Sequence, residues 1–176
     1  KSAWLAAFSG QVLPRVYVDS AIEYDGADLE VDRFSLATRY QPEPGKVFNA
    51  EYRYNNSTTS PIDQVDFSAQ WPIVPRLYGV GRVNYSFKDD ASNTGSTSQG
   101  GRLIQAVGGL EYNGGCWVLR GVLQRIATTQ STASTGFYLQ LELSEFSRLG
   151  SNPLNILKGN IQGYSLINQP TVVYGQ

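Results

Sequence analysis

Residues 33–54 read RFSLATRYQPEPGKVFNAEYRY, which is two alternating segments joined by a turn rich in proline and glycine. In the first segment Phe34, Leu36 and Tyr40 are separated by small or charged residues. The second segment repeats this pattern from Phe48 to Tyr54. A period of two is typical of β-strands with one apolar and one polar face, because successive side chains point to opposite sides. The stretch therefore predicts an antiparallel hairpin.

The same alternation continues on both sides of this hairpin. It is clear at residues 64–71 and 137–144, and weaker at residues 16–24, 77–87, 103–112 and 116–125. With a partial strand at residues 3–9, the sequence predicts nine strands in total. Short connections alternate with long ones rich in Ser, Thr, Asn, Asp and Gly, as in a meander whose two ends differ. We therefore predict an all-β, antiparallel meander of about nine strands, followed by a short irregular tail.

Composition excludes several function classes. The 176 residues carry 14 Lys and Arg against 15 Asp and Glu, so they lack the positive charge that nucleic-acid binding requires. The chain contains no His, which removes His-based acid-base catalysis and His metal ligation. Its single Cys permits no internal disulfide and no cysteine-rich zinc site. We therefore expect no catalytic residues, no metal, no cofactor and no nucleic-acid partner.

Two architectures fit the meander: a soluble sandwich or small barrel with apolar faces inward, and a transmembrane barrel with apolar faces toward lipid. Strands of about eight to eleven residues and loops of unequal length favour the transmembrane barrel. Aromatic residues near strand ends fit two interfacial girdles. The predicted girdle residues are Tyr24, Tyr40, Tyr54, Trp71, Phe87, Tyr112 and Trp117. The predicted lumen-facing polar residues are Arg33, Arg39, Glu51, Arg53, Asp66, Arg82, Asn84 and Arg120.

Nine strands pose a difficulty for this barrel. Closed single-chain bacterial barrels have an even number of strands, and unpaired strand edges cannot be satisfied by lipid. Either the count is one short or the chain is a fragment.

Specific motifs resemble one family. Residues 109–117 read GLEYNGGCW, and they are followed by a strand at 118–125 and by YLQLELSEFS at 138–147. These motifs resemble the carboxy-terminal part of the LptD family. The same resemblance extends to residues 34–54, to the turn QWP at 70–72, and to GSNPL at 150–154 with IQGY at 161–164. This family comprises the outer-membrane proteins that assemble lipopolysaccharide. The resemblance extends to about Asn168.

The resemblance implies a fragment of a barrel of roughly 26 strands in the outer membrane of a Gram-negative bacterium. Residues 1–147 would be transmembrane strands, and residues 148–176 a periplasmic tail. The protein would receive lipopolysaccharide from an LptA-like periplasmic bridge through its missing amino-terminal domain and would hold an LptE-like lipoprotein inside the barrel. It would release lipopolysaccharide into the outer leaflet between its first and last strands. A porin-type channel and a soluble or surface all-β ligand-binding or adhesion module remain the alternatives.

Two sites follow from the resemblance. The last strand would form one side of the lateral gate, through residues Phe137, Tyr138, Leu139, Gln140, Leu141, Glu142, Leu143 and Ser144. Family members commonly carry two adjacent cysteines in the turn that Gly115 and Cys116 occupy here, and these bridge to the amino-terminal domain. Cys116 is therefore the candidate for an inter-domain disulfide. The alternative for Cys116 is a small residue buried beside Trp117.

Overall fold

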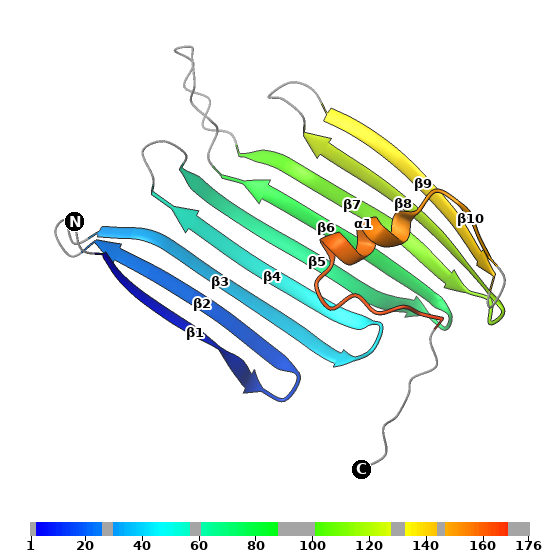
Figure 1. Ribbon diagram of the computed structural model, residues 1–176, viewed down its shortest axis with the longest axis horizontal. Coiled ribbons are helices and arrows are strands. Elements are labelled where there is room, and N and C mark those ends of the chain that lie inside the picture. Colours follow the sequence, from blue (N-terminus) through cyan, green and yellow to red (C-terminus); the bar gives the residue numbers. More distant parts are fainter. Residues whose placement is uncertain are drawn as a thin grey trace.

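The computed structural model describes residues 3–25, 30–56, 61–87, 101–127, 133–143 and 147–168, and these form one antiparallel sheet and one helix (Figure 1). The strands pair in sequence order, from β1 at one edge of the sheet to β10 at the other. The strands are β1 (Ala3–Leu13), β2 (Val16–Asp25), β3 (Glu30–Glu43), β4 (Lys46–Asn55), β5 (Ile62–Val74), β6 (Leu77–Ser86), β7 (Arg102–Asn113), β8 (Trp117–Ala127), β9 (Ala133–Leu143) and β10 (Ser147–Gly150). The predicted all-β meander is confirmed.

Strand register divides the sheet into two chemically different faces. Cross-strand neighbours share a face, because side chains alternate along each strand. One row on the face that we call the apolar face runs through Tyr40, Phe48, Ala69, Gly81, Gly108, Leu123 and Phe137. One row on the opposite face, the polar face, runs through Arg39, Asn49, Ser68, Arg82, Val107 and Gln124. Large side chains of the apolar face, such as Phe67 and Leu123, are exposed.

Three short turns at one end of the sheet share a single chemistry. Each places a proline before a residue of positive φ: Pro14 before Arg15, Pro44 before Gly45, and Pro75 before Arg76. Proline followed by a left-handed residue is the combination favoured in type II turns. These turns fix the strand register at what we call the short-turn end.

The strand count of nine was one short. The tenth strand, β10, has four residues, too few for an alternating pattern to show in the sequence, and it is defined by its pairing with residues 140–143 of β9. The strands also reach further into the turns than expected, since Pro42 and Pro72 lie within β3 and β5 beside register irregularities. Proline is tolerated there because a bulge leaves an amide outside the ladder.

The irregular tail also differs from expectation. Within the tail that was predicted to be irregular, the structure forms the eight-residue helix α1 (Pro153–Asn160). Proline at its start is well placed, because the first amides of a helix have no partner within it. Figure 1 shows α1 lying across one face of the sheet. Among the described residues no helix is long and apolar enough to cross a membrane.

Candidate functional site

The polar face carries all eight residues predicted to line the lumen. Arg33 pairs with Asn55, Arg39 with Asn49, and Asp66 with both Glu51 and Asn84, so the strand register places them on one side of the sheet. Arg53, Arg82 and Arg120 occupy the same phase of their strands. All eight side chains therefore project from the same side of the sheet.

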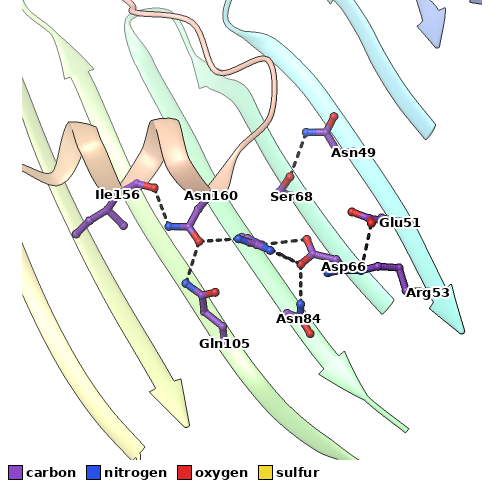
Figure 2. A network of polar contacts seen from close by, with 10 residues as sticks. Asn49, Glu51, Arg53, Asp66, Ser68, Asn84, Gln105, Ile156 and Asn160 are labelled. Carbon is purple, nitrogen blue, oxygen red and sulfur yellow. Dashed lines mark hydrogen bonds and ion pairs between the residues drawn. The ribbon is translucent and has the colours of Figure 1, made fainter. Parts of the chain in front are cut away.

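Asp66 and Arg82 form the centre of one polar network (Figure 2). Arg82 donates from Nε and Nη2 to the Asp66 carboxylate, at 2.9 and 2.7 Å from Oδ2, and Asn84 donates to the same oxygen. Asn160 of α1 accepts from Arg82 Nη1 and from Gln105, both at 2.8 Å. The end of α1 is therefore bonded to side chains on the two neighbouring strands β6 and β7.

Arg120 is the centre of a second, largely buried network. Its side chain has no exposed surface and forms ion pairs with Glu111 of β7, at 2.9 Å, and with Glu142 of β9. Gln70 donates to Glu111 at 3.1 Å, and Asn168 donates to Glu142 at 3.2 Å. Such charges are tolerated in a dry environment only when each has partners, because desolvation of a lone charge costs several kcal/mol. The network thus joins β5, β7, β8 and β9 on the polar face.

Tyr164 closes the second network from the carboxy-terminal side. Its hydroxyl donates to the Glu111 carboxylate. Burial, followed by the neighbouring negative charge of Glu111, raises the pKa of Tyr164 above its ordinary value. The phenol therefore remains a hydrogen-bond donor throughout the pH range in which proteins normally function.

An apolar strip interrupts the polar face where α1 lies. Val47, Val80, Val107 and Val122 are buried there against Leu157 and Ile161. These valines stand in the polar phase of their strands, so four apolar residues at polar positions are the sequence signal for a segment docked on this face. Burial of a leucine-sized side chain contributes about 1.5–3 kcal/mol, which makes this strip a docking surface for α1.

The residues after α1 continue along the sheet toward its short-turn end. Side chains of Gln41 and Asn49 donate to the carbonyls of Gly163 and Gln162 at 3.3 and 2.9 Å, and Asn113 donates to Ile167. Gln70 and Ser165 exchange two hydrogen bonds of 2.9 and 3.0 Å. Residues 151–168, which we call the inner strap, are thus bonded to strands from β3 to β9. The binding of this segment to the sheet has no signal in the sequence, because the contacts join residues about 50 to 120 positions apart.

The outer edge of β9 is only partly covered by the described chain. The predicted gate residues 137–143 lie in β9, and Ser144 lies outside the described residues. We predicted that these residues form the last strand, but β10 follows and pairs with residues 140–143 of β9. Beyond β10, the Ser151 amide donates to the Leu139 carbonyl at 3.1 Å, and the Ser151 hydroxyl accepts from the Leu139 amide at 2.9 Å. From Ala133 to Tyr138 no described strand pairs with this edge.

The predicted girdle residues fall at the two ends of the strands. Tyr40, Trp71, Tyr112 and Trp117 lie near the short-turn end, with Tyr40 stacked on Trp71 at 6.5 Å between ring centres and Tyr112 packed on Trp117 at 5.3 Å. Three more lie at the opposite ends of β2, β4 and β6: Tyr24, Tyr54 and Phe87. The seven aromatic residues therefore group at the two ends of the strands, and their role as interfacial girdles stays a prediction.

Cys116 is exposed in the turn between β7 and β8, so the alternative of a buried thiol is wrong. Gly114 instead lies beside Trp117, where a side-chain carbon would meet the indole ring at 2.3 Å. Gly115 adopts a φ of +92°, and this left-handed residue turns the chain so that the next side chain points outward. An exposed thiol is accessible to a partner cysteine.

No group of three or more His, Cys, Asp or Glu among the described residues could hold a metal ion. The site is instead a sheet with an exposed apolar face, a buried polar network on the other face, and aromatic residues at both strand ends. These features define a segment of β-barrel wall of the outer-membrane class.

Comparison with known proteins gives the family. The family described as LPS transport system D matches residues 1–77. The LPS-assembly protein LptD of Thiobacillus denitrificans is 44% identical over 94% of this chain, and the chain covers 21% of that protein. The LPS-assembly proteins LptD of Azoarcus sp. and Bordetella avium are 39% and 35% identical over 94% and 97% of the chain, which covers 20% and 22% of them. The chain belongs to the LptD family, and it spans about a fifth of the length of these relatives.

Proposed function

We propose that the full-length protein carrying this chain assembles lipopolysaccharide in the outer membrane of a Gram-negative bacterium, and that this chain supplies ten strands near the carboxy-terminal end of its barrel. The observation that carries the proposal is the division of one sheet into an exposed apolar face and a networked polar face. Lipid acyl chains favour the first face, and a hydrated head group favours the second. Relatives that match nearly the whole chain are named LPS-assembly proteins.

A complementation experiment tests this proposal. Cells depleted of their own copy should regain surface lipopolysaccharide when they express the full-length protein, and they should not regain it when residues 3–168 are deleted. The deletion variant must be present at normal abundance in the membrane fraction for the comparison to hold. Restored growth with surface lipopolysaccharide still absent would point to the porin-type alternative.

The outer edge of β9 is the proposed side of the lateral gate. Lipopolysaccharide would leave between this edge and the first strand of the full-length barrel, because a strand edge can open without unfolding the sheet behind it. Phe137→Cys, in a Cys116→Ser background, should stop delivery when it is crosslinked to the first strand. Leu123→Cys is the matched control, since Leu123 lies directly opposite Phe137 on the same face but within the sheet. Normal delivery through a locked β9 would reject the gate.

Partner proteins follow from the same proposal. The polar face would contact an LptE-like lipoprotein inside the barrel, and the amino-terminal domain would receive lipopolysaccharide from an LptA-like bridge. The inner strap would belong to the periplasmic part assigned to residues 148–176, on the lumen side of the short-turn end. Copurification of a lipoprotein with the full-length protein, reduced by charge reversal at Arg53, would support the lumen assignment.

Cys116 is the proposed point of covalent attachment to the amino-terminal domain. Its exposure at the short-turn end leaves the thiol accessible to a cysteine outside the chain. On non-reducing gels the full-length protein should run faster than its reduced form, and Cys116→Ser should abolish the difference. Identical mobility in both lanes would leave Cys116 as a free thiol.

We assign no catalytic step to the chain. None of its 176 residues is His, and the fully buried carboxylate of Glu111 is held by Arg120 and Gln70. These two features support a role in the binding and passage of lipopolysaccharide, with energy supplied elsewhere.

A further inference from the structure

A cavity of about 240 Å³ lies where the end of α1 meets the polar face of the sheet. Its walls come from β2 to β6 on one side and from residues 158–162 of the inner strap on the other. Figure 2 shows Asn49, Glu51, Asp66 and Ser68 together with Asn160 in this part of the molecule. The cavity therefore exists only when the inner strap is docked.

The carboxylates in the wall already have partners. Asp66 is held by Arg82 and Asn84, and Glu51 forms an ion pair with Arg53 at 3.1 Å. Asp19, the third, accepts from Ser9. Two of the three carboxylates are thus paired with arginine and the third accepts from a hydroxyl, and a cationic ligand would have to compete with these bonds.

Two cationic side chains in the wall are not matched in the same way: Arg39, which is half-buried, and Lys158, which is exposed. The Nε atom of Arg39 is buried and has no hydrogen-bond partner among the described residues. Lys158 lines the same cavity, and no ion pair within the described part of the chain includes it. A buried donor without an acceptor costs about 1–3 kcal/mol, which a bound anionic oxygen would recover.

One acceptor in the wall is also unsatisfied. Asn49 donates its amide hydrogens to Ser68 and to the Gln162 carbonyl, whereas its Oδ1 atom is buried without a partner. A hydroxyl group can donate to this oxygen, and a deprotonated phosphate oxygen cannot. The cavity thus combines cationic donors with a neutral acceptor.

We propose that this cavity binds a phosphorylated sugar, with the phosphate at Arg39 and Lys158 and a sugar hydroxyl donating to Asn49. The volume fits a single sugar unit, since it is smaller than the roughly 300–1,000 Å³ of pockets for drug-sized ligands. The source of the sugar phosphate rests on the function proposed above: it would be the head group of a lipopolysaccharide molecule that passes the inner strap.

Calorimetric titration of the full-length protein in detergent, with any partner that it retains, tests this inference. The probes are glucose 1-phosphate, glucose and inorganic phosphate. Glucose 1-phosphate should bind most tightly, and Arg39→Gln and Lys158→Gln should each weaken its binding about tenfold or more, because each removes a charge-assisted hydrogen bond. Arg33→Gln is the matched control: Arg33 lies on the same strand and face as Arg39 but does not line the cavity. It should leave the affinity unchanged.

Three results would overturn the inference: no binding of glucose 1-phosphate, binding of inorganic phosphate that is equally tight, or equal losses in Arg33→Gln and Arg39→Gln. Lipopolysaccharide delivery in cells is measured in parallel with the same proteins. If the protein delivers lipopolysaccharide but binds no sugar phosphate, the proposed binding site is rejected and the proposed function is left intact. Sugar-phosphate binding by a protein that does not deliver lipopolysaccharide would instead contradict the proposed function alone.

Discussion

The hydroxyl of Tyr164 donates a hydrogen bond to the Glu111 carboxylate, which joins the inner strap to β7 near the short-turn end of that strand. Glu111 also holds the buried Arg120 guanidinium, so the strap contacts the sheet at its least exposed charges. The inner strap is therefore part of the packing of the polar face, and a substitution in either one should destabilise the other.

Tyr164→Phe should lower the free energy of unfolding by about 1–3 kcal/mol, because it removes a hydrogen bond to a buried carboxylate. The measurement is urea unfolding of the full-length protein in lipid vesicles. Tyr17→Phe is the control, since Tyr17 is exposed on β2. An equal and small effect of both substitutions would show that the bond contributes nothing to stability.

Alkaline pH should weaken the same contact. The pKa of Tyr164 is raised in the folded protein, so the unfolded state loses this proton first, starting near a pH of about 10. The stability that Tyr164 contributes is therefore complete below that pH and decreases above it. The difference in unfolding free energy between the native protein and Tyr164→Phe should shrink from about pH 10 upward. A difference that stays constant to high pH would contradict this coupling.

Arg120→Met should destabilise the protein by about 3–5 kcal/mol, because it leaves the carboxylates of Glu111 and Glu142 buried without their cation. The free energy of unfolding is again the measurement. Arg53→Met is the control, since Arg53 is exposed although it also forms an ion pair on the polar face. Adding Glu111→Gln and Glu142→Gln to Arg120→Met should recover part of the loss, whereas no recovery would indicate a packing defect.

Leu157→Ala should release the inner strap. Leu157 is fully buried in the apolar strip, and its truncation should cost about 2–5 kcal/mol of docking free energy. Limited proteolysis should then cut the strap faster than in the native protein. Leu149→Ala, at an exposed residue of β10, should leave the cleavage rate unchanged. Equal cleavage of both variants would argue against docking through this strip.

Gly150→Ala should separate the strap from β9. Gly150 has a φ of +105°, and a side-chain carbon there would lie 2.3 Å from the Leu139 carbonyl oxygen. Faster hydrogen exchange at the Leu139 amide, which the Ser151 hydroxyl protects, is the expected result. Gly159→Ala is the matched control because nothing lies within 4 Å of its added carbon, and helix propensity should make it neutral or slightly stabilising.

Local patterns predicted the sheet well because strand formation depends on alternation that can be counted along the chain. Residues 33–54 show this clearly: they became β3, β4 and the Pro44–Gly45 turn. The same alternation placed Arg39, Glu51 and Asp66 on one face, as the register confirms. The strand β10 was missed because four residues carry too little periodicity to be recognised.

Sequence alone thus determined the all-β meander, the separation of apolar from polar faces and the family resemblance, because these depend on neighbouring residues and on motifs. Only the tertiary structure decided that the tail forms a helix, that this helix docks on four valines of the polar face, and that Tyr164 meets Glu111 across 53 positions. Those contacts depend on how strands distant in sequence bring side chains together. Alternation along the chain does not indicate which residues distant in sequence will come into contact.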